Sequence, residues 1–155
     1  ESIFPLMKQY GTYLVPTIIA GKSAADSSKI PGYYPPMVAK KAAEIGPRIQ
    51  NTFAKAYKAG VKIAFGTDAG VYQHGKNWKE FVYMTEAGMP AIEAIQSATW
   101  NAADLMGTQA ILGSIEKNKL ADIIAVDGDP ITNIEAMGKV NFVMKDGVVY
   151  KTKSK

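Results

Sequence analysis

The stretch VKIAFGTDAG, residues 61–70, places a carboxylate just beyond an apolar segment. Residues 61–65 are apolar except for Lys62, a pattern typical of a strand that helices cover on both faces. Asp68 follows three residues later, at the end of a parallel strand where α/β proteins bind ligands. A carboxylate there can ligate a metal or take a proton from water. The alternative is a turn aspartate or a helix cap, because Gly-Thr-Asp-Ala-Gly is also good loop sequence.

The loop after this strand, VYQHG at 71–75, holds the only histidine of the chain, His74. A histidine in this position could contact substrate or act as a general acid. The alternative is a solvated loop side chain without a role. Tyr72 is a further candidate for substrate contact.

Outward from residues 61–65, the apolar spacing predicts the order helix, strand, helix, strand, helix, helix, which is typical of α/β proteins. The predicted segments are a helix at 2–10, a buried strand at 12–19, a long polar loop at 21–36, a helix at 37–59, the strand at 61–65, and helices at 77–87 and 90–106. Pro47 lies inside the longest helix, so a second helix could begin there.

The pattern becomes β-rich after Gly107. It predicts a strand at 121–126 and a hairpin at 142–150, in which Asp146-Gly147 fits a two-residue type I′ turn. We therefore expect two parts, residues 1–107 and residues 108–155, the second belonging to a separate small sheet.

Composition excludes several classes of site. The 155 residues contain no cysteine, which rules out disulfides, thiolate nucleophiles and cysteine metal sites. With one histidine, a complete catalytic zinc site, which usually takes three protein ligands, is not expected within this chain. The net charge of +4 comes from scattered lysines, so we expect no nucleic-acid partner. No apolar run approaches the ~20 residues that span a bilayer.

Several motifs together resemble the amidohydrolase superfamily, in particular its imidazolonepropionase-like and Xaa-Pro dipeptidase (prolidase-like) members. The first is GTDAG after an apolar strand, followed by Tyr72 and His74-Gly75. The further matches, in order along the chain, are TYLVPT (12–17), ATWNAA (98–103), GSIE (113–116), LADIIAV (120–126) and VMKDG (143–147).

This resemblance implies a metal-bearing (β/α)₈ barrel with a small β-sandwich built from both chain ends. Family ligands are a His-x-His on the first strand, often a carboxylated lysine on the fourth, histidines on the fifth and sixth, and an aspartate on the eighth. Asp68 matches that last aspartate, which would ligate a divalent metal, expected to be zinc (one or two ions), and carry a proton from water to the leaving amine. By the same resemblance, His74 and Tyr72 would contact substrate.

The chain lacks the His-x-His, and a complete barrel takes ~250 residues. The resemblance therefore implies the C-terminal part of a longer enzyme: about strands seven and eight with their helices, plus strands of the sandwich. The remaining metal ligands would lie outside this chain.

The sequence leaves three functions open. The first is hydrolysis of amide bonds in small substrates, of the Xaa-Pro dipeptide type; the second is hydrolysis of a cyclic amide, of the imidazolonepropionase type. The third is a structural or interaction domain that is inactive in isolation. Because part of a barrel leaves strand edges and apolar faces uncovered, we expect this segment to be ordered only beside an N-terminal portion of the barrel or beside other copies, as a homo-oligomer.

Overall fold

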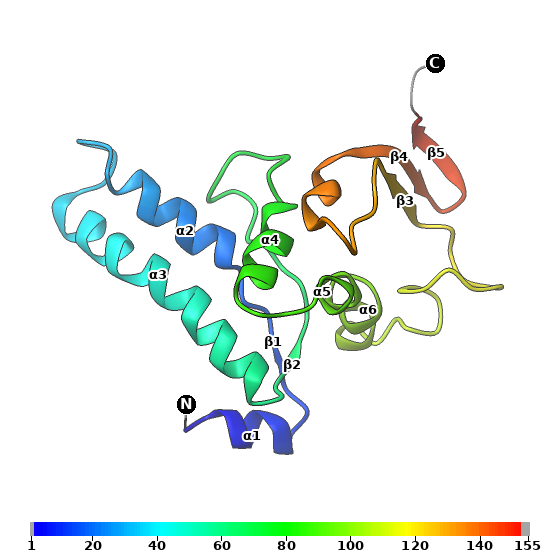
Figure 1. The fold of residues 1–155 in the computed structure, drawn as a ribbon, viewed down its shortest axis with the longest axis horizontal. Coiled ribbons are helices and arrows are strands. Elements are labelled where there is room, and N and C mark those ends of the chain that lie inside the picture. The colour runs from blue at the N-terminus through cyan, green and yellow to red at the C-terminus, as the bar shows by residue number, and fades with distance from the viewer. Residues whose placement is uncertain (1, 153–155) are drawn as a thin grey trace.

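The computed structural model describes residues 2–152, with helices and a short strand pair on one side and a small sheet on the other (Figure 1). The helical part comprises α1 (Phe4–Gln9), β1 (Tyr13–Leu14), α2 (Ile18–Ser27), α3 (Pro36–Lys58), β2 (Lys62–Ile63), α4 (Lys79–Glu86), α5 (Ala91–Ser97) and α6 (Trp100–Leu105). The second part comprises β3 (Ile123–Val126), the 3₁₀ helix η1 (Ile134–Gly138), β4 (Val140–Lys145) and β5 (Val148–Lys151).

The strands β1 and β2 pair in parallel, with Tyr13 opposite Lys62 and Leu14 opposite Ile63. Antiparallel helices α2 and α3 lie on one side of this pair, and α5 and α6 lie on the other (Figure 1). The main core gathers around Ile63 of β2. It is built from residues of α2, α3, α4, α5 and the α4–α5 connection: Ile18, Phe53, Phe81, Met84, Met89 and Ala94. This arrangement fits the expected α/β architecture, in which helices cover parallel strands.

The small sheet is antiparallel, in the order β3-β4-β5. Its hairpin turn is confirmed, because Asp146 and Gly147 both have positive φ, at 49° and 77°, as a type I′ turn requires. Helix η1 packs against α4 and so attaches the sheet to the helices. The boundary predicted at residue 107 coincides with the end of α6, but it stays a prediction.

Two predicted segments in the N-terminal third are wrong in part. The strand expected over 12–19 is only two residues long, as is the strand expected over 61–65. Residues 21–27 of the loop expected over 21–36 belong to helix α2, whereas residues 28–34 are turns and bends, as a loop should be. The chain turns at Pro16 and Thr17, where Thr17 has φ 46°, and then starts a helix whose first three residues are buried. Tertiary packing thus decides this segment, in which the helix-favouring alanines stand beside a glycine and two serines, so that local propensity is mixed.

The other helices differ in their boundaries. The segment predicted as one helix over 90–106 is two, α5 and α6, separated at Ala98 and Thr99. In contrast, α3 continues through Pro47 as one helix. The residue before a proline is sterically disfavoured in the α region, and here that residue is Gly46, which has no Cβ to clash.

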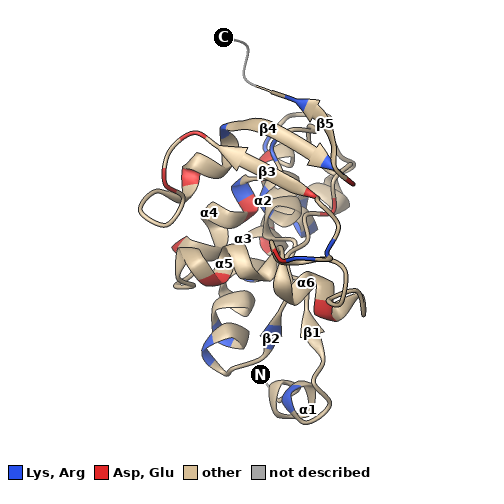
Figure 2. Ribbon diagram, turned by 90° about the vertical axis from the view of Figure 1, so that its right-hand side faces the viewer, with Lys and Arg blue, Asp and Glu red and all other residues tan. Residues whose placement is uncertain are grey.

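Lysines and acidic residues are spread over helices, loops and sheet without forming a single basic band (Figure 2). Within the described part of the chain, no helix combines the length and apolarity needed to cross a bilayer.

Candidate functional site

The two parallel strands end side by side and stay in contact beyond their last paired residues. The amide of Ala64 donates to the carbonyl oxygen of Leu14 at 3.1 Å. A Cβ on Gly66 would lie 2.3 Å from Cγ1 of Val15, so glycine is required for this close approach. The segments after β1 and β2 therefore leave the strands as neighbours and form one rim.

Asp68 lies on this rim in a left-handed conformation, with φ 49°. Aspartate tolerates this region better than most residues. The carbonyl oxygen of Asp68 accepts from the Val71 amide at 3.4 Å, which closes a turn. Its side chain is exposed and has no hydrogen-bond or ion-pair partner within residues 2–152. The carboxylate is therefore available to bind something from outside the described chain.

The two predicted substrate residues follow on the same loop. His74 is exposed and makes no hydrogen bond in the described region. The Tyr72 hydroxyl is buried, yet no partner for it exists among residues 2–152. Leaving a buried hydroxyl unpaired costs roughly 1–3 kcal/mol. No hydrogen bond joins Asp68, Tyr72 and His74 to one another, so the chain brings them onto one loop without building a network.

A complete metal site is not formed by this part of the chain. Residues 2–152 hold no group of three or more histidine, cysteine, aspartate or glutamate side chains placed to bind an ion. Asp68 fits the role of a single carboxylate ligand, but the described residues do not supply the rest of a catalytic zinc site.

Sequence reasoning missed a buried carboxylate behind the rim, Glu80 of α4. It is fully buried and accepts hydrogen bonds from the amides of Ile18 at 2.9 Å and Ile19 at 2.7 Å. Burial raises the pKa of Glu80 to about 7, against the opposing effect of the two amide bonds. The available signal was spacing: Glu80 stands four residues before buried Met84, on the apolar face of the helix.

A second polar contact holds the loop that carries Asp68. The side-chain amide of Asn77 donates to Oγ1 of Thr67 at 3.0 Å. The Asn77 carbonyl oxygen in turn accepts from the Glu80 amide at 3.1 Å. The hydrogen bond between Thr67 and Asn77 thus joins the two ends of the loop, and Asp68 directly follows Thr67.

The opposite end of the strand pair carries a different polar cluster. The Tyr13 hydroxyl donates to Asp104 at 2.6 Å, and Lys62 lies 3.5 Å from the same carboxylate. Burial, together with the bond to Asp104, raises the pKa of Tyr13 to about 12. Polar contacts at the N-terminal end of barrel strands serve stability, whereas chemistry is found at the other end.

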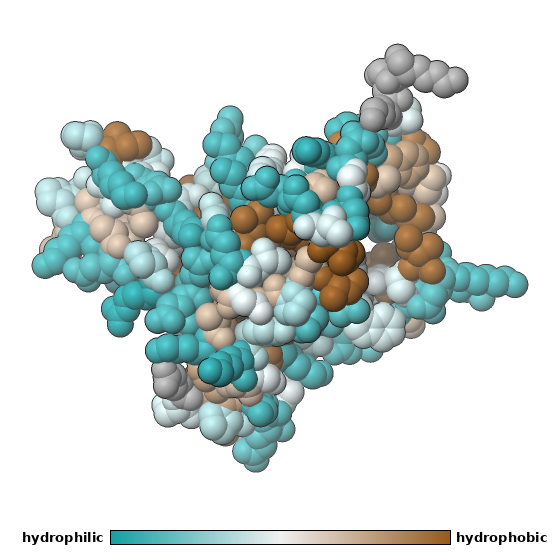
Figure 3. All heavy atoms as spheres, in the orientation of Figure 1, coloured by the Kyte–Doolittle hydropathy of each residue, from teal (hydrophilic) through white to brown (hydrophobic). Residues whose placement is uncertain are grey.

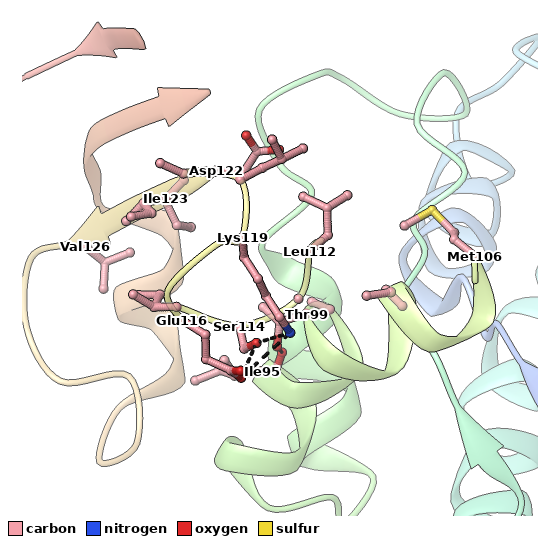
Figure 4. A pocket seen from close by; sticks show the side chains of 18 of the residues that line it. Ile95, Thr99, Met106, Leu112, Ser114, Glu116, Lys119, Asp122, Ile123 and Val126 are labelled. Carbon is pink, nitrogen blue, oxygen red and sulfur yellow. Dashed lines mark hydrogen bonds and ion pairs between the residues drawn. The ribbon is translucent and has the colours of Figure 1, made fainter. Parts of the chain in front are cut away.

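A groove of about 690 Å³ lies away from the rim, between the sheet and α5–α6. Figure 4 shows its mainly apolar lining and a polar cluster, in which Lys119 donates to Ser114 at 2.6 Å and lies 3.7 Å from Glu116. Thr99 and Asp122 add further polar atoms to the lining. Figure 3 shows apolar side chains gathered around the sheet and in the hollow beside it. The groove is not lined by Asp68, Tyr72 or His74. The candidate site is therefore the rim, and the groove is an apolar surface apart from it.

Comparison with known proteins gives consistent matches over nearly the whole chain. The model of the amidohydrolase family matches residues 3–150. A crystal structure of a Xaa-Pro dipeptidase with methionine bound in its active site is 57% identical, with a TM-score of 0.94. A prolidase complexed with N-methylphosphonate-L-proline is 28% identical, with a TM-score of 0.87. The ochratoxinase of Aspergillus niger is 38% identical over 101 residues, which cover 62% of this chain and 21% of that protein.

These matches extend over much less of the relatives than of this chain. The dipeptidase match covers 97% of this chain and 37% of the other, and the prolidase match covers 98% and 38%. The chain spans about a third, 34%, of the length of the first curated relatives that it matches. The expected fold class is confirmed, since the chain superposes on a C-terminal part of these proteins and carries a small antiparallel sheet. The chain belongs to the amidohydrolase family.

Proposed function

We propose that this chain provides the last metal ligand and the proton carrier of an amidohydrolase that cleaves the amide bond of dipeptides of the Xaa-Pro type. The observation that carries this proposal is the 57% identity to a Xaa-Pro dipeptidase over 97% of the chain. A second neighbour was solved with a proline-containing phosphonate, which supports the same substrate class.

Asp68 is the residue to which we assign the chemistry. When bound, a divalent metal, for which zinc is our candidate, would polarise the scissile carbonyl and lower the pKa of the attacking water. The Asp68 carboxylate, exposed at the strand end, accepts the proton of that water and then delivers it to the leaving amine. Tyr72 and His74 are proposed to contact the substrate from the loop that follows.

A second proposal concerns the 155-residue chain by itself, for which we infer no catalytic activity. Its support is that one rim carboxylate, without two further ligands in residues 2–152, is too small a donor set for a catalytic zinc. The remaining ligands would come from an N-terminal portion of the barrel, whether on the same polypeptide or on a companion.

The test compares Asp68→Asn with wild type in the protein as isolated, together with any polypeptide that accompanies it. Asparagine keeps the shape and removes the proton-accepting charge, so we expect kcat/KM on an Xaa-Pro dipeptide to fall by about 10²–10⁴-fold. Removal of metal by a chelator should abolish turnover, and added zinc should restore it. A cyclic amide assayed in parallel tests the imidazolonepropionase-type alternative.

Asp26→Asn serves as the matched control, because the Asp26 carboxylate lies on the surface, in an exposed ion pair with Lys29. It should retain activity within about twofold. Near-normal turnover by Asp68→Asn would disprove the assigned role. Tight stoichiometric zinc binding by the 155-residue chain alone would disprove the second proposal.

A further inference from the structure

We propose that Glu80 is a positioning residue that fixes the backbone of Asp68, because its carboxylate closes a ring of contacts joining the ends of both strands. Only the predicted effect on kcat rests on the proposed function. The ring of contacts is a property of the described residues.

The first half of the ring runs along the strands. Leu14 and Ala64 share a hydrogen bond of 3.1 Å, and Gly66 approaches Val15 so closely that no Cβ fits. These contacts fix the distance between the two chains where they leave the strand pair. They do not fix the direction in which either chain continues.

The second half of the ring sets those directions. After β1, the chain turns at Thr17, and the next two amides, of Ile18 and Ile19, both donate to the Glu80 carboxylate. After β2, the chain passes Thr67 and returns at Asn77, which bonds Thr67 with its side chain and Glu80 with its carbonyl oxygen. Glu80 is therefore the residue at which the two segments meet.

Asp68 is held inside this ring by its neighbours. It follows Thr67 directly and adopts φ 49°, a conformation that costs about 1 kcal/mol or more for a non-glycine residue and persists only where surrounding contacts offset that cost. The Asp68 carboxylate has no partner in residues 2–152, so no side-chain contact fixes its direction. Its direction depends on the backbone of the neighbouring residues, and of these Thr67 is held by its hydrogen bond with Asn77.

The alternative is that Glu80 only caps the N-terminus of α2, which would predict no effect on the loop that carries Asp68. Glu80 accepts from the first amides of α2, and a carboxylate at a helix N-terminus is favourable in any protein. If capping were its whole role, loss of one acceptor oxygen would loosen α2 and leave residues 66–71 unchanged. The ring predicts that residues 66–71 change as well.

The experiment uses Glu80→Gln in the protein as isolated, with any accompanying polypeptide. Glutamine has the same shape but one acceptor oxygen in place of two. Amide exchange at Ile18 and Ile19 should accelerate about tenfold or more, since one of the two acceptor oxygens that these amides share is lost. The backbone chemical shifts of Asp68 should move, and the order parameters of residues 66–71 should fall below the ~0.85 of rigid backbone. Under the proposed function, kcat should fall about tenfold with KM within about twofold.

Two further variants separate the halves of the ring. Asn77→Ala removes only the Thr67 bond, so it should shift Asp68 and leave Ile18 and Ile19 protected. Glu86→Gln, an exposed acid on the same helix, should change neither segment. If Glu80→Gln does not fold, Asn77→Ala decides the proposal by the same shifts.

Unchanged Asp68 shifts in Glu80→Gln, with Ile18 and Ile19 deprotected, would reduce Glu80 to a helix cap and overturn the inference. The inference would also be overturned if the Ile18 and Ile19 amides of Glu80→Gln exchanged as slowly as those of wild type. The exchange and chemical-shift measurements need no turnover. If the protein hydrolysed no amide bond, the proposed function would be disproved. The exchange rates and chemical shifts would still decide the role of Glu80.

Discussion

Two residues, Thr17 and Asp68, have left-handed backbones at the ends of neighbouring strands, with φ 46° and 49°. For Thr17 this is unusual, because a β-branched side chain crowds that conformation. Such residues persist where surrounding contacts impose them, and they cluster at functional sites. Here the imposing contacts include Glu80, which bonds the two amides that follow Thr17. Strain and anchoring therefore occur at the same end of the strand pair as the candidate carboxylate.

Glu80 also makes the stability of the protein depend on pH. Its pKa rises from 4.5 in the unfolded chain to about 7 in the folded protein, because burial outweighs the two amide bonds. Between these pH values the folded state binds a proton that the unfolded state has released, so the stabilisation is complete below pH 4.5 and is lost as pH rises through about 7. At about 1.4 kcal/mol per pKa unit, the change is roughly 3 kcal/mol.

The measurement is chemical unfolding of wild type and Glu80→Gln at several pH values from 4.5 to 8. Glutamine does not titrate, so the difference in unfolding free energy between the two proteins isolates the contribution of Glu80. Wild type should lose stability relative to the variant across this interval. A difference that stays constant with pH would show that the carboxyl group keeps an ordinary pKa.

At the scale of elements, local sequence predicted the segments with strong periodicity or strong turn residues. The helix ending at Gly60 and the Asp146-Gly147 hairpin are confirmed, because glycine and aspartate there adopt the positive φ that their positions require. Helix α2 was missed because its identity depends on contacts with α3 and Glu80, which lie far away in sequence. The candidate site follows the same division. Asp68 was predicted from its motif and stays a prediction, whereas the contacts of Glu80 and Asn77 are revealed only by the folded chain.

The packing of α2 on α3 depends on a glycine that sequence alone would count as a defect. A Cβ on Gly46 would lie 2.5 Å from the Cβ of Ala25 and 2.8 Å from the carbonyl oxygen of Gly21. Gly46→Ala gains about 1 kcal/mol of helix propensity but forces the two helices apart. We expect a net loss of about 1–3 kcal/mol in unfolding free energy, measured by urea denaturation.

The matched control for this prediction is Gly21→Ala on the facing helix. Its Cβ would meet only the side chain of Ile49, and the one severe contact, with Cδ1 at 2.4 Å, can be relieved by a change of rotamer. We expect this variant to stay within about 1 kcal/mol of wild type. If Gly46→Ala proved as stable as Gly21→Ala, close helix packing would not be what glycine provides at position 46.

At the scale of the whole molecule, the described chain has two kinds of incompleteness. The rim presents one candidate ligand where a metal site needs more, and the groove beside the sheet presents apolar side chains where a core needs a covering layer. Exposed residues around that groove include Met106 at 64% and Ile115 at 82% of their maximal area. Surfaces of this kind mark contacts with another chain or segment. Both features fit a chain that corresponds to about a third of its solved relatives.

We therefore predict that the 155-residue chain, purified alone, self-associates at micromolar concentration and binds a hydrophobic dye such as ANS, as measured by sedimentation velocity and fluorescence. Ile124→Glu places a charge in the groove and should shift sedimentation toward smaller species, because burying an unpaired carboxylate is costly. Ile131→Glu is the control, since Ile131 is equally exposed but does not line the groove, and it should sediment like wild type. A monodisperse wild-type monomer without dye binding would show that these 155 residues form a complete folding unit whose groove needs no covering chain.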